Sequence, residues 1–430
     1  MRDLARQIFL DTLKGIAIPR IFKQKIEYSR GVLRIEQDLY DLSSYARVLL
    51  ISMGKAAHAM LEVLLAQTGP TLEGIVVCSQ PPQAQQPGFR YFQGRHPLPN
   101  EESQHAARAV LKYVSGASES TLVIYLISGG ASAMVEAPHD AEISLDDLIQ
   151  TYRVLVDSGA TIGEINAIRK HLSAIKGGRL AQAAYPAQQV SIMISDVPEK
   201  SLDALASGPT MPDSSREEDC YRIAAEHGIT SRFPNSIRSL FEQHRLQPTA
   251  KADDPAFVRA RWWPILSSAS AAQAAAGLIS QHGFAVEIDN TPDDWPYELA
   301  ADYLLTRLRE LKKGVSRAAL VSAGELTVKV SGNSGVGGRN QQFALQCAAT
   351  IAGEDIVVLS AGTDGIDGNS VAAGAIVDGT TLSRATQLGI DPAAALRSFD
   401  AFPIFEKLGD AVITGPTGNN VRDVRILLAY

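Results

Sequence analysis

The sequence predicts an α/β protein of two domains, of which the first is a doubly wound, Rossmann-like parallel sheet. Four short apolar runs in the first half, at residues 47–52, 74–78, 122–127 and 190–195, show no alternation with polar residues. Strands of this kind are buried on both faces, which is typical of a parallel sheet covered by helices. Segments rich in Ala and Leu separate the runs, as βαβ units require.

The second half changes character near residue 318, where glycine-rich loops begin to join the apolar runs. These runs lie at 318–323, 326–330, 356–361 and 411–414. We therefore expect a second, smaller α/β domain. The expected ranges are a first domain over 1–250, a connecting segment with a strand–helix–strand unit over 251–317, and a C-terminal domain over 318–430.

Composition excludes several classes of protein. The chain of 430 residues has 40 basic and 47 acidic residues and a net charge of −7. An acidic chain disfavours a nucleic-acid partner, and any anionic ligand must be bound by local cations. No apolar run approaches the roughly 18 residues of a membrane span. Residues 3–14 read as an amphipathic helix rather than a signal peptide, and three scattered cysteines suit a reducing compartment, so we expect a cytoplasmic protein without a membrane partner.

Lys55 is the first candidate ligand-binding residue. It lies in Ser52-Met-Gly-Lys55-Ala-Ala57, between an apolar run and a helical segment. Ligands of open α/β sheets bind at the carboxyl ends of strands, where helix N-termini attract anions, so Lys55 is well placed for a phosphate or carboxylate. The alternative is a solvated surface lysine. A P-loop is not expected, because Leu49 stands where its first glycine would be.

The segment Ser128-Gly129-Gly130-Ala131-Ser132 follows the run at 122–127. Its glycines allow backbone N–H groups to approach an anion closely, and a helix starting here would add its dipole. The alternative is a tight turn between a strand and a helix.

Arg169 and Lys176 lie in a stretch, 165–180, that carries cations and no acid. If the stretch is helical, the seven-residue spacing places both side chains on one face, where unpaired cations favour an anion. The alternative is a basic surface helix.

Asp196 and Asp364 each follow an apolar run. A carboxylate at the carboxyl end of a strand suits two tasks, holding Mg²⁺ and accepting a proton from a substrate hydroxyl. The alternative is an aspartate that only forms a turn.

Two glycine-rich loops of the second half also suit anions. The loop at 331–338 opens a helical segment at Arg339, whose planar guanidinium makes fixed contacts with phosphate or carboxylate. Its glycines do not form a dinucleotide-binding fingerprint. The segment 414–421, with hydroxyl and amide side chains beside Gly and Pro, could bind phosphate or sugar-acid oxygens, or form a capped turn.

Taken together, these motifs resemble the glycerate 2-kinases. The N-terminal domain of that family is matched by Gly54-Lys55-Ala-Ala57, Ser128 to Ser132, Arg169-Lys-His-Leu172 with Lys176-Gly-Gly178, and Ser195-Asp196 with Ser207-Gly-Pro-Thr210. The C-terminal MOFRL domain is matched by Gly337-Gly-Arg-Asn-Gln341, Gly362-Thr-Asp-Gly-Ile-Asp-Gly368 and Thr414-Gly-Pro-Thr-Gly418. The motifs occur in family order along nearly the whole chain.

The resemblance implies a kinase that uses ATP and Mg²⁺ to phosphorylate D-glycerate at its 2-hydroxyl, in a cleft between the two domains. Lys55, Arg339, Asp196 and Asp364 would be catalytic, and both aspartates would hold the metal. The residues expected to bind substrate or nucleotide are Ser128, Gly129, Gly130, Ser132, Arg169, Lys176, Gly337, Gly338, Asn340, Thr363, Thr417 and Asn420.

The sequence leaves three questions open. Val371 stands where the family pattern has a carboxylate, which questions any metal or substrate role of that position. The alternative functions are an NAD(P)H-dependent hydroxypyruvate reductase, a name also used in the family, and a sugar-acid-binding protein without catalysis. The oligomeric state is not determined, and a homodimer is compatible with the sequence.

Overall fold

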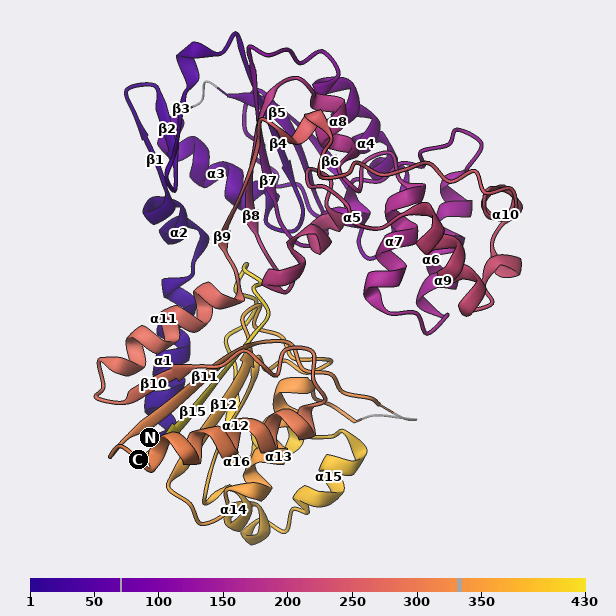
Figure 1. Ribbon diagram of the computed structural model, residues 1–430. Coiled ribbons are helices and arrows are strands. Elements are labelled where there is room, and N and C mark those ends of the chain that lie inside the picture. The colour runs from indigo at the N-terminus through magenta and orange to yellow at the C-terminus, as the bar shows by residue number, and fades with distance from the viewer. Residues whose placement is uncertain (70–71, 331–334) are drawn as a thin grey trace. The chain divides into compact units, whose positions relative to one another are not determined.

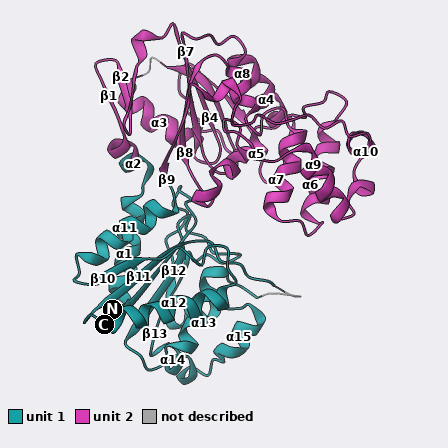
Figure 2. Ribbon diagram, in the orientation of Figure 1, with its two compact units in different colours: residues 1–20, 266–430 teal, residues 21–265 magenta. Residues whose placement is uncertain are grey.

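The computed structural model describes residues 1–69, 72–330 and 335–430, which form two compact units (Figure 2). Unit 2 comprises residues 21–265, and unit 1 comprises residues 1–20 together with 266–430. Each unit has its own six-stranded sheet and its own core.

The sheet of unit 2 has the strand order β6-β5-β4-β7-β8-β9, and its pairs from β6 to β8 are parallel (Figure 1). The strands are β4 (Arg47–Met53), β5 (Glu73–Cys78), β6 (Phe89–Gln93), β7 (Thr121–Ile127), β8 (Gln188–Ile194) and β9 (Ala260–Leu266). Every residue of β7 is buried. The doubly wound parallel sheet expected from the apolar runs is therefore confirmed.

Helices cover both faces of this sheet. Leu49 and Ile51 of β4 share a core with α4 (Glu101–Val114) and α8 (Arg179–Ala184). Ser52 points to the opposite face, where its hydroxyl donates a 2.7 Å hydrogen bond to the carbonyl of Ala57 at the start of α3 (Ala57–Thr68). The remaining elements around the sheet are α2 (Ile18–Lys25), α5 (Ala131–Met134) and an antiparallel sheet of β1 (Ile26–Ser29), β2 (Val32–Ile35) and β3 (Asp38–Asp41).

A group of four helices in unit 2 has a separate apolar core, and Figure 1 shows it beside the sheet. It consists of α6 (Leu145–Val156), α7 (Ile162–Leu172), α9 (Glu217–Glu226) and α10 (Asn235–Glu242). We call it the helical subdomain. The carboxyl half of α7 carries Arg169, so this subdomain positions one of the candidate cations.

The sheet of unit 1 is mixed, with the order β10-β11-β15-β12-β13-β14. Its strands are β10 (Ala285–Ile288), β11 (Ala318–Gly324), β12 (Ile356–Gly362), β13 (Gly374–Asp378), β14 (Ala411–Val412) and β15 (Asp423–Ala429). The last strand, β15, runs antiparallel to both β11 and β12 and lies between them. The start of β15 therefore meets the carboxyl ends of its two neighbours.

Helices α12 (Tyr297–Lys312) and α13 (Arg339–Thr350) pack on one face of this sheet and share its main core. Helices α1 (Arg2–Gly15) and α11 (Ser268–Ser280) pack against each other and against the sheet (Figure 1). Three short helices complete the unit: α14 (Thr381–Gln387), α15 (Pro392–Ser398) and α16 (Phe402–Leu408).

The units do not coincide with the ranges 1–250, 251–317 and 318–430. Helix α1 belongs to unit 1 because its apolar face, including Ile8 and Phe9, is buried there. The strand–helix–strand segment expected within 251–317 is divided, because β9 joins the sheet of unit 2 whereas α11 and β10 belong to unit 1. The expected strand at 326–330 is wrong, since this segment forms only an isolated bridge between Pro296 and Thr327.

Candidate active site

Lys55 is held at the carboxyl end of β4 by contacts of its backbone. The amide of Lys55 donates to the carbonyl of Gly129 (2.9 Å), and the amide of Ala56 donates to Oγ of Ser128 (3.0 Å). Gly54 has φ +116°, and a Cβ at this position would clash with the Ser128 carbonyl, so only glycine allows the two loops to meet. The Lys55 side chain itself is exposed, which leaves the ammonium accessible to a ligand.

The loop 128–132 and Asp196 lie against each other. A Cβ on Gly129 would overlap the Asp196 carboxylate, and a Cβ on Gly130 would lie 3.2 Å from Cγ of Lys55. The three groups follow β7, β8 and β4, which are neighbours in the sheet. The fold of unit 2 thus brings together Lys55, Asp196 and residues 128–132.

Ser132 is connected to a strained turn that sequence reasoning did not identify. Its hydroxyl lies 2.9 Å from Oγ of Ser207, which in turn lies 3.5 Å from Oδ1 of Asn166. Ser207 and the preceding Ala206 both have φ in the left-handed region, at +59° and +53°. Such a conformation is unfavourable for residues other than glycine and occurs where surrounding contacts enforce it. The Ser207-Gly-Pro-Thr motif contained this serine, but no sequence signal indicated its contact with Ser132.

Arg169 and His96 add two nitrogen-bearing groups to this region. The guanidinium of Arg169 stacks on the ring of Tyr152, at 4.6 Å from the ring centre, and its buried Nε has no hydrogen-bond partner among the described residues. Burial, and then the charges of Lys55 and Arg169, lower the pKa of His96. His96 follows β6, and no motif had singled it out. A buried, unpaired guanidinium nitrogen favours an anionic ligand.

Lys176 does not join this group, and its expected role as a ligand-binding cation needs correction. Its ammonium is fully buried in an ion pair with Glu136. The same carboxylate accepts hydrogen bonds from Tyr152 (2.5 Å) and Ser173 (2.6 Å). Because α7 ends at Leu172, the helix does not continue to residue 176 and the seven-residue spacing does not place Lys176 beside Arg169. The ammonium of Lys176 is therefore already paired inside the protein.

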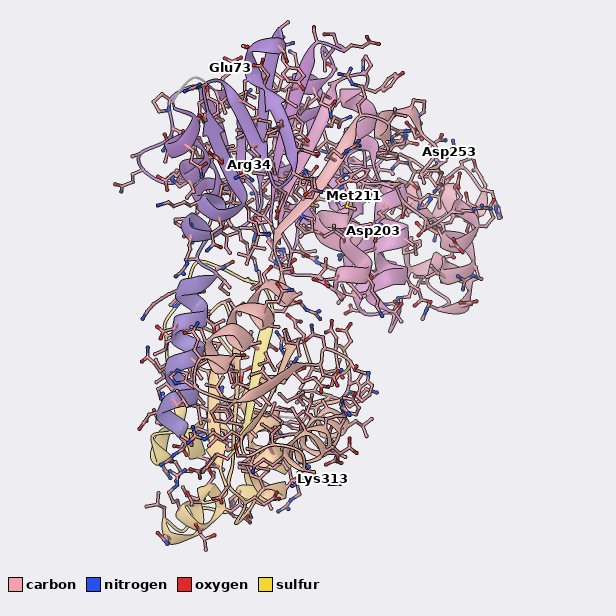
Figure 3. All side chains as sticks on the ribbon, turned by 60° about the vertical axis from the view of Figure 1, so that its left-hand side comes forward. Arg34, Glu73, Asp203, Met211, Asp253 and Lys313 are labelled. Carbon is pink, nitrogen blue, oxygen red and sulfur yellow. The ribbon has the colours of Figure 1, made fainter. Side chains whose placement is uncertain are left out.

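Other cations of the same stretch are also engaged internally. Lys170 donates to Asp203 (2.9 Å) and to Asp213 (3.0 Å), and Asp203 is labelled in Figure 3. Arg179 donates to the backbone carbonyls of Lys170 (2.7 Å) and Gln247 (3.0 Å). Within 165–180, Arg169 is thus the cation that stays available to a ligand.

In unit 1, Arg339 begins α13 and contacts two carboxylates. Its Nε lies 2.5 Å from Oδ2 of Asp423, and its Nη2 lies 3.1 Å from Oδ1 of Asp423 and 2.8 Å from Oε1 of Glu325. Burial acts to lower the pKa of Arg339, but Asp423 and then Glu325 outweigh it and raise this pKa. Burial raises the pKa of Glu325. The guanidinium is therefore permanently charged and held in one orientation.

Asp364 lies near this ion pair because of the strand register. Asp423 is paired with Gly324 of β11 on one side and with Gly362 of β12 on the other. A Cβ on Gly362 would lie 2.9 Å from Oδ1 of Asp364 and 3.4 Å from Oδ1 of Asp423. Oδ1 of Asp364 accepts the amide of Ile366 (3.1 Å). One edge of the sheet thus carries Arg339, Asp364 and Asp423.

The glycine loop before α13 differs from the expected phosphate loop. The amides of Asn340 and Gln341 donate to the buried carboxylate of Asp367 (3.0 and 2.9 Å), and the amide of Gly337 donates to Oδ1 of Asn369 (2.8 Å). A Cβ on Gly338 would clash with Asp367. Gly338 is the N-cap residue of α13, and the Asp367 carboxylate, from a loop distant in sequence, accepts from the free amides of the helix N-terminus and compensates its dipole. Residues 331–334 of this motif lie outside the described residues.

Two further expected ligand-binding side chains are internal, which corrects their assignment. Asn340 is buried, and its Oδ1 accepts the hydroxyl of Ser360 (2.6 Å). Thr363 is buried, and its hydroxyl donates to the carbonyl of Arg422 (2.7 Å). Thr417 donates to the carbonyl of Thr363 (2.6 Å), and Oδ1 of Asn420 accepts the amide of Arg422 (3.0 Å). Thr417 and Asn420 are partly exposed and stay predicted ligand contacts.

The donor types fit a magnesium ion. The described residues contain no group of three or more His, Cys, Asp or Glu side chains arranged for a metal. Mg²⁺, however, usually keeps several waters and is held by one or two carboxylates together with substrate phosphates. Asp196 in unit 2 and Asp364 in unit 1 supply carboxylates of this kind, and their assignment as metal ligands stays a prediction.

Comparisons with known proteins place the chain in a family. Residues 4–242 match a domain of unknown function, DUF4147, and residues 318–423 match the MOFRL family. A D-glycerate 2-kinase of Thermotoga maritima is 36% identical over 97% of this chain and 98% of its own length. The chain belongs to the glycerate 2-kinase family. A glycerate 2-kinase of Pyrococcus horikoshii is 33% identical over 100% of this chain and 97% of its own length. A relative from Agrobacterium vitis is provisionally named a hydroxypyruvate reductase. It is 37% identical over 89% of this chain and 87% of its own length.

Solved structures agree with this family assignment. The crystal structure of a glycerate kinase from Thermotoga maritima has a TM-score of 0.86 and 33% identity, and the match covers 100% of this chain and 99% of that one. The crystal structure of a protein from Pyrococcus horikoshii has a TM-score of 0.85 and 31% identity, and the match covers 100% of this chain and 98% of that one. The α/β architecture and the resemblance inferred from the motifs are thereby confirmed. Among the residues that the structure describes, no helix is long and apolar enough to span a bilayer.

Proposed function

We propose that this member of the glycerate 2-kinase family transfers the γ-phosphoryl group of ATP to the 2-hydroxyl of D-glycerate, with Mg²⁺, and forms 2-phosphoglycerate and ADP. The observation that carries the proposal is the meeting of Lys55, Asp196 and the loop 128–132 at one sheet edge, in a chain that covers 98% of a D-glycerate 2-kinase. A cation, a carboxylate and a loop suited to anions are the groups that phosphoryl transfer requires.

Arg169, whose charge lowers the pKa of His96, suits the glycerate carboxylate. Its guanidinium is fixed on the Tyr152 ring, and a fixed planar donor orients a carboxylate better than a flexible one. Lys55, whose side chain is exposed, suits the phosphoryl group, because the flexible side chain of a lysine can follow charge as it moves during transfer. Ser132, held by Ser207, would orient a substrate oxygen.

Asp196 and Asp364 are the candidates for the general base and for the metal ligands. One of them would accept the proton of the attacking hydroxyl, and both have carboxylates at strand ends. When bound, Mg²⁺ supplies neutralisation of the phosphate charge. Arg339 would contribute a fixed positive charge to the same task, with Asp423 and Glu325 setting its orientation.

A coupled assay that measures ADP release with D-glycerate, ATP and Mg²⁺ tests the proposal. We expect ADP formation that depends on all three, and ³¹P NMR should identify the product as the 2-phosphate. ADP formation at the level of a control without glycerate would refute the glycerate assignment. Oxidation of NAD(P)H by hydroxypyruvate, measured in parallel, would support the reductase instead. Binding of glycerate without turnover would support a non-catalytic binding protein.

We also propose a cytoplasmic location. All three cysteines, Cys78, Cys220 and Cys347, are free and buried, which suits a reducing compartment. Size-exclusion chromatography with light scattering tests the homodimer, which stays a prediction.

A further inference from the structure

A cavity of about 330 Å³ lies in unit 2 beside the helical subdomain. It is formed by the loop after Pro138, the end of α7 and the segment after α10, and its volume lies within the range of small-molecule sites. Lys55, Arg169, Asp196 and the loop 128–132 do not line it. It is therefore separate from the candidate active site.

His171 is one of the residues that line this cavity, and its ring has a hydrogen-bond acceptor without a partner among the described residues. The side chain is 2% exposed, and Nδ1 lies 2.8 Å from the carbonyl of Ala167 and 3.2 Å from Sγ of Cys220. A carbonyl can only accept, so Nδ1 carries the proton and Nε2 has a free lone pair. Burial lowers the pKa of His171, which keeps the ring in this neutral form. Nε2 is buried and has no hydrogen-bond partner among the described residues. A ligand that donates a hydrogen bond would satisfy it.

Two opposite charges line the same cavity. Arg245 is exposed and forms no ion pair with any described residue. Among the described residues, the Asp140 carboxylate accepts the amide of Glu142 alone, at 2.9 Å, and so keeps acceptor capacity. His139, whose pKa is lowered by burial, adds no charge at neutral pH. A ligand that carries both a positive and a negative group matches this pair better than a simple anion, which Asp140 would repel.

The rest of the wall is apolar. Four aliphatic side chains line the cavity: Ile143, Leu172, Leu240 and Leu246. All four are buried, with between 1% and 6% of each residue exposed, so a ligand would contact only their exposed edges. An aliphatic side chain of the ligand would gain about 25 cal/mol per Å² of apolar surface that it buries here.

We propose that this cavity binds a small α-amino acid with an aliphatic side chain. Arg245 binds the carboxylate, Asp140 and Nε2 of His171 accept hydrogen bonds from the ammonium group, and the four aliphatic residues contact the side chain. The site is independent of the proposed kinase function, and its test requires no turnover.

Isothermal titration calorimetry of the full-length protein with L-leucine tests this site. Three analogues of the same size separate the contacts: leucinamide lacks the carboxylate, 2-hydroxyisocaproate replaces the ammonium by a hydroxyl, and isocaproate lacks it altogether. We expect saturable binding of one leucine per chain and at least about tenfold weaker binding of each analogue. No detectable heat with leucine, or equal affinity for 2-hydroxyisocaproate, would overturn the proposal.

Variants test whether the binding occurs in this cavity. Arg245→Gln and Asp140→Asn should each weaken leucine binding at least about tenfold. Arg232→Gln, which changes an exposed arginine outside the cavity, is the matched control and should bind leucine as the unaltered protein does. Unfolding temperature and kinase activity without leucine check that each variant is folded. Unchanged leucine affinity in Arg245→Gln and Asp140→Asn would place the binding elsewhere and refute the site.

Discussion

Arg339 and Asp423 form a two-pronged ion pair, with Nε 2.5 Å from Oδ2 and Nη2 3.1 Å from Oδ1. The Asp423 side chain is 2% exposed, whereas 35% of the Arg339 side chain is exposed. The acid is thus anchored in the sheet, and the guanidinium extends from it toward solvent. Asp423 acts as a positioning residue that fixes the plane of Arg339.

Arg339→Lys should therefore lower kinase activity about a hundredfold although it keeps the charge, because an ammonium cannot retain the two-pronged geometry and misplacement is costly. Arg339→Ala should be at least as severe. The measurement is kcat and KM for ATP and glycerate. Full activity of Arg339→Lys would show that only charge matters at this position.

Asp423→Asn should reduce kcat through Arg339 rather than directly. It should also cost roughly 1–3 kcal/mol of stability, since a buried charged hydrogen bond is lost while Glu325 still pairs with Arg339. If Asp423 acts only by positioning, the double variant with Arg339→Ala should be no less active than Arg339→Ala alone. Additive losses of activity would contradict this coupling.

Lys55→Ala should reduce phosphoryl transfer by about two to three orders of magnitude, because it removes a cation that faces the developing charge. Its unfolding temperature should stay nearly unchanged, since the side chain is exposed and the backbone bonds remain. Lys112→Ala, at an exposed position of α4, is the matched control and should affect neither property. Equal activity of both variants would identify Lys55 as a surface residue.

Lys176→Met should act on stability. It leaves the Glu136 carboxylate buried without its cation, at a cost of about 3–5 kcal/mol. A marked fall in the unfolding temperature is expected. Adding Glu136→Gln should recover part of it, because a neutral amide can still bond to Tyr152 and Ser173. A stable but inactive Lys176→Met would instead restore the ligand-binding role that the spacing suggested.

Asp367 should make stability depend on pH. Burial raises its pKa from 3.8 to about 6 against the hydrogen bonds that it accepts from α13. Because the folded state holds the proton more tightly, this group contributes stability below pH 4 that is lost as the pH rises through 6. The contribution is about 3 kcal/mol, from two units at 1.36 kcal/mol each.

The test for Asp367 compares the free energy of unfolding against pH for the unaltered protein and for Asp367→Asn. The variant is expected to be less stable overall, because its amide NH₂ faces the donors of the helix N-terminus. The informative quantity is the slope, whose negative component between pH 4 and 6 should disappear. Parallel curves would show that Asp367 does not titrate in this range.

Much of the fold followed from local patterns. The apolar runs became β4, β5, β7 and β8 with boundaries shifted by one or two residues, because strands buried on both faces leave a strong signal. The segment 326–330 shows the limit of such patterns: it is apolar enough for a strand, but it pairs only at Thr327. The cleft expected between the domains stays a prediction, because the positions of the two units relative to one another are not determined.

The sequence by itself determined which loops follow buried strands, and hence that Lys55, the loop 128–132, Asp196 and Asp364 lie at strand ends. Only the tertiary structure decided which polar groups are already paired. Lys176 and Arg169 look equivalent along the chain, yet one is neutralised by Glu136 and the other stacks on Tyr152 with an unpaired Nε. Asp423 carries no motif and meets Arg339 because β15 runs antiparallel between β11 and β12. The partner of a charge is set by contacts distant in sequence, and such contacts leave no periodic signal in the chain.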